Sequence, residues 1–392
     1  MPEERSSRLS PTLRDGERVT PLELFFDLVF VLAITQCTAL MSHHPTWSGL
    51  AQGLLVLGML WWAWTGYAWL TSVVDPEEGA VRLVIFGAMA ALLLVSLCVP
   101  EAFGSLALAF ALIYGVVRTA HIALFMLASP EDDGLRHSVL GLAVSTVIAV
   151  SLLVIASFFD GLAQGALWAL ALLLDMGGPY FFGSEGWKLM PEHFAVRHGL
   201  IVIIALGESI VAIGIGASHT LSLGIGAAAV LGVALTAAMW WAYFDIVAIV
   251  AGRRLVEAER GRAQNEMARD SYSYLHLPMV AGIVLAALGM KTTIGHFGDH
   301  LHTVPAFALL GGLAIYLLGH VAFRYRHVHT INRRRLLLAI VLLILVPVAT
   351  EVPALVALAV VNVLIWAMIA YETRSYGEGR RQVRRPEATT AT

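Results

Sequence analysis

Long apolar stretches recur along almost the whole chain and are separated by short polar connections. A bilayer core about 30 Å thick needs roughly 20 helical residues, because an α-helix rises about 1.5 Å per residue. On this scale the pattern predicts twelve membrane-spanning helices, at 22–41, 49–74, 81–100, 105–128, 138–159, 163–183, 196–218, 223–250, 273–292, 304–323, 335–350 and 353–372. The junction of the last two spans contains Pro347, Glu351 and Pro353. An alternative prediction therefore merges or shortens these two spans.

The basic residues are distributed unequally between alternate connections. With both termini on the inner side, 23 of the 25 Lys and Arg residues fall on that side. Lys291 falls on the outer side, and Arg118 lies within the fourth predicted span. Cytoplasmic loops of membrane proteins carry such an excess of basic residues. The sequence therefore predicts a multi-pass membrane protein with both termini in the cytoplasm.

Short segments of the first half of the chain recur in the second half. Trp61-Trp62-Ala63-Trp64 returns as Trp240-Trp241-Ala242-Tyr243, and Ile113-Tyr114 returns as Ile315-Tyr316. A unit of six spans crosses the membrane an even number of times, so two copies enter from the same side. The predicted fold is thus an all-α transmembrane bundle built from two parallel six-span repeats. The alternative is chance similarity between apolar segments.

The predicted organisation has five parts. These are a cytosolic N-terminal segment at 1–20, a first six-span half at 21–183, an interfacial connector at 184–195, a second half at 196–373 and a disordered basic tail at 374–392. The Arg residues of the tail are expected to contact anionic lipid headgroups. The expected partner is the lipid bilayer, with a homo-oligomer also possible.

Composition excludes several classes of protein. Hydrophobic residues make up 58% of the 392 residues, charged residues 14%, and the mean hydropathy is +0.77. These values exclude a soluble globular domain, a disordered chain and a nucleic-acid binder. The two cysteines, Cys37 and Cys98, lie in apolar runs and cannot form a disulfide framework or a metal cage. The chain contains no phosphate-binding loop or catalytic motif, so neither a cofactor nor enzymatic activity is expected.

Ionisable residues inside the predicted spans are the best candidates for function, because a charged side chain at the bilayer centre costs about 2.5–3.5 kcal/mol on insertion scales. They are predicted to form an ion pathway or a buried polar network of Asp27, Glu208, Asp175, Asp245, Arg118, His121, Arg197, His198, His276, His320 and Glu23. Glu23 and Asp27 are four residues apart and share a helix face, as do Arg118 and His121, which are three apart. We expect Arg118 to pair with one of the inner carboxylates.

This set of residues has two interpretations. A structural network of ion pairs would hold the helices in register. A functional pathway would use the acids as carriers and the histidines as groups that titrate near neutral pH. Asp27 and Glu208 are the strongest candidates for a pathway, whereas Glu23 could simply lie at the inner interface. The tryptophan-rich runs are typical of packing or lipid-interface positions.

Several segments resemble those of the bacterial low temperature requirement protein A family. The stretch from Arg18 to Gln36 is similar to the opening signature of the family, and the stretch from His193 to Ser209 is similar to its second hallmark. Residues 240–245 and 276–279 also resemble family positions, and the resemblance extends from about 19 to about 371. The family usually has an acid where this chain has Val196. The resemblance implies a multi-pass protein of the bacterial plasma (inner) membrane, in a family named for a growth phenotype in the cold.

The functional expectation is a transporter or channel for protons or a small cation, with Asp27 and Glu208 in its pathway. One alternative is a membrane protein that does not transport but senses or supports the state of the bilayer in the cold. Another is a lipid-modifying enzyme.

Overall fold

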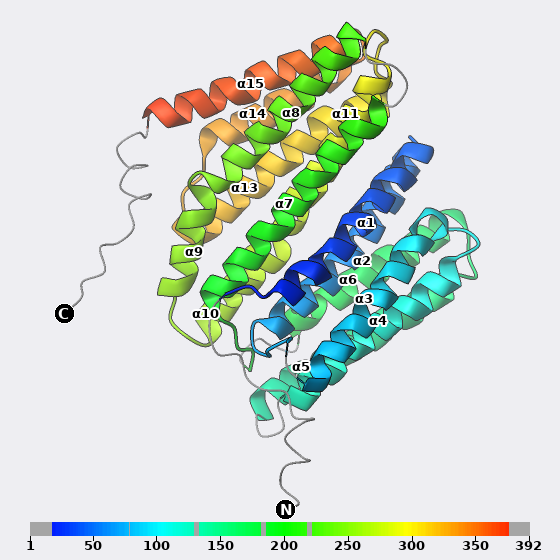
Figure 1. The fold of residues 1–392 in the computed structure, drawn as a ribbon, viewed down its shortest axis with the longest axis vertical. Coiled ribbons are helices and arrows are strands. Elements are labelled where there is room, and N and C mark those ends of the chain that lie inside the picture. Colours follow the sequence, from blue (N-terminus) through cyan, green and yellow to red (C-terminus); the bar gives the residue numbers. More distant parts are fainter. Residues whose placement is uncertain (1–17, 78, 129–132, 182–185, 218–221, 376–392) are drawn as a thin grey trace, which may run out of the picture. The chain divides into compact units, whose positions relative to one another are not determined.

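The long helices of the structure coincide with the apolar stretches of the sequence. The computed structural model describes residues 18–77, 79–128, 133–181, 186–217 and 222–375. Its long helices are α1 (Pro21–His43), α2 (Trp47–Thr71), α3 (Gly79–Cys98), α4 (Ala107–Ala128), α5 (Asp133–Ala156), α6 (Gly161–Phe181), α7 (Pro191–Gly216), α8 (Leu223–Phe244), α11 (His276–Gly295), α13 (Gly312–Val328), α14 (Arg333–Ala349) and α15 (Ala354–Ser375) (Figure 1).

Shorter helical segments join or extend several of these helices. They are η1 (Val99–Glu101), α9 (Val247–Glu257), α10 (Arg262–Met267), η2 (Ala268–Tyr274), α12 (Thr303–Ala306) and η3 (Phe307–Gly311). Both η2 and η3 are π-helical. The described residues contain no strand, and an isolated bridge joins His300 to Pro353.

The predicted all-α transmembrane architecture is confirmed. Eleven helical segments in the described part of the chain are long and apolar enough to cross a membrane. The remaining predicted span corresponds to α14, which has 17 residues. At 1.5 Å per residue this helix extends about 26 Å, somewhat less than the bilayer core. The two predicted six-span repeats stay a prediction.

The described residues divide into two compact units. The N-terminal unit comprises the described parts of Met1–Ile204 together with Ala258–Ser273. The C-terminal unit comprises Ala205–Glu257 together with the described parts of Tyr274–Thr392. The start of α7 therefore belongs to one unit and the rest of that helix to the other. Most of the predicted N-terminal segment and of the basic tail, with its expected lipid contacts, lies outside the described residues.

In the N-terminal unit, α2 is the most deeply buried of the membrane-spanning helices. It packs against α1, α4 and α6, while α3 contacts α1 and α4, and α5 contacts α4 and α6 (Figure 1). In its apolar stretch, 83% of the residues are buried, so neighbouring helices surround α2 and its aromatic side chains lie inside the unit. Trp61, Trp62, Trp64, Tyr67 and Trp69 are all buried. These rings form the walls around the polar groups described below.

In the C-terminal unit, α11 is packed so closely that glycine is required at its contacts. It packs against α13 and η3, and α8 packs against α15. A Cβ atom built on Gly282 of α11 would lie 2.6 Å from the backbone oxygen of Gly312 and 2.6 Å from the backbone nitrogen of Tyr316. Small residues allow such approach between membrane helices. The backbone atoms of α13 cannot move aside as a flexible side chain could.

We therefore expect Gly282→Ala to destabilise the protein by about 1–3 kcal/mol, the usual cost of overpacking. The measurement is thermal unfolding of the purified protein in detergent. Gly214→Ala in α7 is the matched control, because a Cβ atom there has nothing within 4 Å. An unchanged unfolding midpoint for Gly282→Ala would contradict this account of the packing.

Candidate functional site: buried ion pairs

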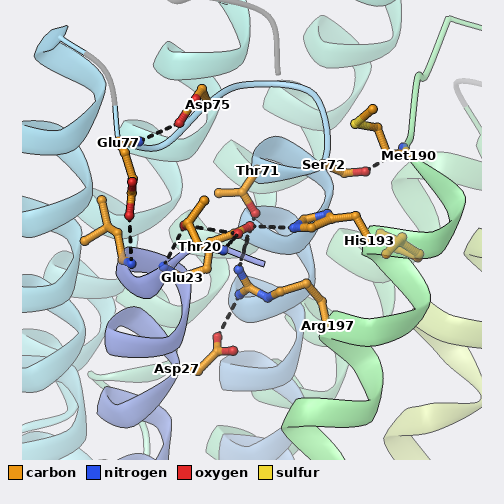
Figure 2. Close-up of polar contacts among 12 residues, drawn as sticks. Thr20, Glu23, Asp27, Thr71, Ser72, Asp75, Glu77, Met190, His193 and Arg197 are labelled. Carbon is orange, nitrogen blue, oxygen red and sulfur yellow. Dashed lines mark hydrogen bonds and ion pairs between the residues drawn. The ribbon is translucent and has the colours of Figure 1, made fainter. Parts of the chain in front are cut away.

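Four ionisable side chains meet where α1 and α7 lie beside α2 in the N-terminal unit (Figure 2). Glu23 and Asp27 come from α1, and His193 and Arg197 come from α7. Each pair is four residues apart, so a single face of each helix carries both groups. All four side chains are at most 1% exposed. We call these four residues the α1–α7 cluster.

Arg197 joins the two carboxylates of the cluster. Its Nη1 atom lies 2.9 Å from Glu23 Oε1, and its Nη2 atom donates a hydrogen bond of 2.7 Å to Asp27 Oδ1. The Nη1 atom also donates a 3.4 Å hydrogen bond to the hydroxyl of Thr71 on α2. Nε2 of His193 lies 2.9 Å from the same Glu23 oxygen. The guanidinium of Arg197 can contact both carboxylates at once because its N–H donors form a rigid planar fork.

The two oxygens of Glu23 have separate roles, and the start of α1 depends on one of them. Oε2 accepts a hydrogen bond of 2.8 Å from the backbone N–H of Thr20, and the Thr20 hydroxyl accepts one from the N–H of Glu23. This is a capping box, which satisfies orphan donors at a helix start. Oε1 remains for His193 and Arg197. The carboxylate thus links the end of a helix to the buried cluster.

Asp27 is held in place by an aromatic side chain as well as by Arg197. Nε1 of Trp64 on α2 donates a 2.9 Å hydrogen bond to Asp27 Oδ1. The other oxygen, Oδ2, is buried and has no hydrogen-bond partner among the described residues. The Arg197 guanidinium also lies 5.8 Å from the centre of the Trp64 ring, a cation–π distance. Trp64 therefore has a polar role in addition to packing.

The formal charges of the cluster do not balance unless it holds one proton. Two carboxylates carry two negative charges, whereas Arg197 supplies one positive charge. The cluster is neutral when His193, or one of the carboxyl groups, is protonated. An uncompensated charge is costly in buried surroundings. Because these groups interact strongly, the proton belongs to the cluster rather than to a single residue.

A second buried ion pair joins α4 to α6. Arg118 Nη2 lies 3.1 Å from Asp175 Oδ1, and both side chains are at most 1% exposed. Thr146 of α5 connects them, because its hydroxyl accepts a hydrogen bond of 2.9 Å from Arg118 and donates one of 3.0 Å to Asp175. The Ser145 hydroxyl lies 3.4 Å from the same carboxylate oxygen. Each charge of this pair has one direct counter-charge.

The two other predicted histidines of the N-terminal unit lie among aromatic rings. His198 is fully buried, and its Nδ1 atom lies 2.9 Å from the backbone oxygen of Phe194 one turn earlier. Its ring centre lies 4.9 Å from that of Trp64. His121 is buried against the ring of Tyr67, with centres 5.4 Å apart. Neither histidine belongs to the α1–α7 cluster.

The C-terminal unit has a polar group of its own. Glu372 of α15 accepts a hydrogen bond of 2.9 Å from Arg335 Nη2 of α14. Arg335 Nη1 lies 3.1 Å from His320 Nδ1, and because a guanidinium is only a donor, this histidine nitrogen must accept. His276 Nε2 lies 2.8 Å from the Tyr243 hydroxyl.

Glu208 and Asp245 are buried in the C-terminal unit, at 2% and 4% exposure. Of the predicted residues, Glu23, Asp27 and Arg197 thus lie in the α1–α7 cluster, Arg118 and Asp175 form a separate pair, and His320 belongs to a third group with Arg335 and Glu372. Within the described part of the chain, no group of three or more His, Cys, Asp or Glu side chains could hold a metal ion.

Sequence reasoning missed His193, Arg335 and Glu372 as site residues. His193 was assigned to the connector because the predicted span began at residue 196, whereas α7 begins at Pro191. Its spacing of four from Arg197 was the available signal. Arg335 and Glu372 lie at the ends of their predicted spans, where charges are ordinary. Only the packing of α14 against α15 brings them together.

Val196, where the family usually has an acid, lies on the outward side of α7. Its side chain is 51% exposed, whereas its neighbour Arg197 is fully buried. The α1–α7 cluster is complete without a group at this position.

Arg197 is expected to be the residue on which the α1–α7 cluster depends for stability. Arg197→Met leaves two buried carboxylates without their guanidinium, so we expect a loss of about 3–5 kcal/mol in the free energy of unfolding. Thermal unfolding in detergent measures it. Arg254→Met removes an exposed pair with Glu257 and should cost no more than about 1 kcal/mol. Equal effects of the two substitutions would argue against a buried network that depends on Arg197.

The full length of the chain can be compared with known proteins. It is 28% identical over 371 residues to an uncharacterized protein from Rhizobium meliloti (strain 1021), covering 89% of this chain and 88% of that protein. No solved structure matches the chain with significance. The family model for the bacterial low temperature requirement A protein (LtrA) matches residues 18–370, a range that contains the α1–α7 cluster and both signature segments. The predicted resemblance is thereby confirmed: this multi-pass membrane protein belongs to the bacterial low temperature requirement A family.

Proposed function

We propose that the protein is a transporter or channel of the bacterial inner membrane that moves protons, or a small cation, through the α1–α7 cluster. The observation that carries this proposal is the charge imbalance of the cluster. Two buried carboxylates share a single guanidinium, and a neighbouring histidine is in contact with one of them. Such a cluster gains or loses one proton with a change in net charge, which is what a carrier requires.

The geometry favours a proton over a metal cation at this site. The Arg197 guanidinium already occupies the position between the two carboxylates, at 2.9 and 2.7 Å. A metal cation would have to displace it, whereas a proton needs no additional space. The 2.9 Å separation of His193 Nε2 and Glu23 Oε1 is short enough for direct proton transfer. We therefore assign the proposed exchangeable proton to the His193–Glu23 pair.

In the proposed orientation, this pair lies near the cytoplasmic side. With the N-terminus inside, Glu23 lies in the first turn of α1, and His193 lies in the first turns of α7. Glu208 lies eleven residues beyond Arg197 on α7, which is about three turns and roughly 16 Å along the helix. Eleven residues return to nearly the same face of the helix. Glu208 is therefore the next proposed carrier toward the outer side.

Asp27→Asn separates the proposed transport from the stability of the fold. The amide keeps an oxygen for Trp64, and Glu23 and Arg197 then balance in charge without an added proton. We expect this variant to fold with a loss of about 1 kcal/mol and to lose most of its proton flux. The measurement is acidification of proteoliposomes containing a trapped pH dye, driven by a potassium diffusion potential.

Two further variants complete the experiment. His193→Gln removes the proposed proton acceptor and should also abolish flux, whereas Glu257→Gln, on the exposed side of α9, should transport like the wild type. The wild-type protein should be assayed for protons, potassium and sodium. Background leak for all three ions, or normal flux in Asp27→Asn, would overturn the proposal.

The competing function is a membrane protein that does not transport but supports the state of the bilayer in the cold. The Arg118–Asp175 pair favours it, because that pair is balanced in charge and connected through Thr146, as expected of a structural network. This function predicts that substitutions in either group lower stability or abundance, with no flux for them to alter.

A further inference from the structure

A pocket in the N-terminal unit is built from donors and aromatic walls. Its lining includes Thr65 and Trp69 of α2, Arg118 and His121 of α4, Trp187 of the connector and Arg269 of η2. It contains about 450 Å³ of empty space, part of it open to the surroundings. The α1–α7 cluster contributes no residue to it.

Several buried polar atoms of this lining have no protein partner. The Thr65 hydroxyl, Nε of Arg118 and both ring nitrogens of His121 form no hydrogen bond among the described residues. The three side chains are 1–2% exposed. Buried polar groups in native proteins are nearly always satisfied by protein, water or a ligand. Together they indicate a ligand that accepts hydrogen bonds at this end of the pocket.

The charges around the pocket favour an anionic group. Among the described residues, Arg118 and Arg269 line the pocket, whereas no Asp or Glu does. Asp175 pairs with Arg118 and Asp270 pairs with Arg269, but neither acid lines the pocket. Arg197 shows that a single guanidinium in this protein can hold two carboxylates. Arg118 could likewise donate hydrogen bonds to a second carboxylate, supplied by a ligand.

The remaining walls favour an apolar and flat body. Trp69 and Trp187 contact each other at a tilt of 59°, with ring centres 5.7 Å apart, and Trp187 packs edge-on against Phe125. Arg269 is held over the Tyr180 ring at 3.9 Å, which keeps its guanidinium plane in place. Aromatic rings of this kind bind planar groups by offset or edge contacts. The η2 segment that carries Arg269 is π-helical, a distortion that is frequent at functional sites.

We propose that this pocket binds an organic monocarboxylate with an apolar, preferably aromatic, body. Thr65, Arg118 and His121 bind the carboxylate, and the body packs against the outer faces and edges of Trp69 and Trp187. This binding does not depend on the proton pathway proposed above, since the two sites share no residue. It assigns a ligand class to a part of the protein that the α1–α7 cluster does not explain.

Binding is measured by calorimetry on the purified full-length protein in detergent, with benzoate, octanoate and benzamide as probes. Benzoate should bind, octanoate should bind more weakly, and benzamide, which lacks the negative charge, should bind at least about tenfold more weakly than benzoate. Tighter binding of octanoate than benzoate would keep the carboxylate site but overturn the aromatic preference. Absence of binding for both acids, or equal binding of benzamide, would overturn the proposal.

Thr65→Val tests the site with little risk to the fold, because the two side chains have nearly the same shape. We expect this variant to weaken benzoate binding about tenfold, through loss of one hydrogen bond to a charged group. Thr236→Val is the matched control, since that buried hydroxyl already bonds to Gly232 within α8. Normal unfolding of both variants shows that the fold is retained. Wild-type affinity in Thr65→Val would contradict the assignment of the carboxylate end.

Discussion

The need to compensate buried charge governs the polar architecture of this protein. In an apolar bundle an ionisable side chain must find a counter-charge or a hydrogen-bond partner, because the penalty for an unpaired charge is several kcal/mol. Arg197 meets this need for two carboxylates at once. In doing so it joins α1 to α7, two helices that lie far apart in the sequence. Glu23 adds a link to the start of α1 through its capping box.

The same constraint is met differently in other parts of the chain. Arg118 and Asp175 are matched one to one, with Thr146 between them. In the C-terminal unit, Glu372 on α15 is paired with Arg335 on α14. There His320 is a further partner of Arg335, so a single guanidinium again contacts two side chains.

This difference in compensation separates structure from proposed function. A pair with equal and opposite charges has no reason to exchange a proton. The α1–α7 cluster has one carboxylate in excess and a histidine beside it, so its charge can change by one. The pocket beside Arg118 lacks hydrogen-bond partners rather than charge, because several buried polar atoms of its lining have no acceptor or donor among the described residues. A transported proton can correct the first imbalance, and a bound ligand can supply the missing hydrogen bonds of the second.

Apolar runs of about 20 residues predicted the helices, since each run must satisfy its backbone hydrogen bonds within itself when it crosses a membrane. The spacing of four in Glu23 and Asp27 likewise predicted a shared face, because that depends only on the period of a helix. The candidate site was recovered in part. His193 was missed because α7 begins five residues earlier than its apolar run.

What the sequence by itself determined is therefore local: which segments are helical, which residues share a face and to which family the chain belongs. Only the tertiary structure decided which charges meet. Arg118 could have paired with any of several inner acids, and packing of α4, α5 and α6 selected Asp175. Arg335 and Glu372 looked like ordinary residues of helix ends until α14 and α15 packed together. The physical reason is that the partners of a buried charge depend on contacts between helices, which the period of a single helix does not encode.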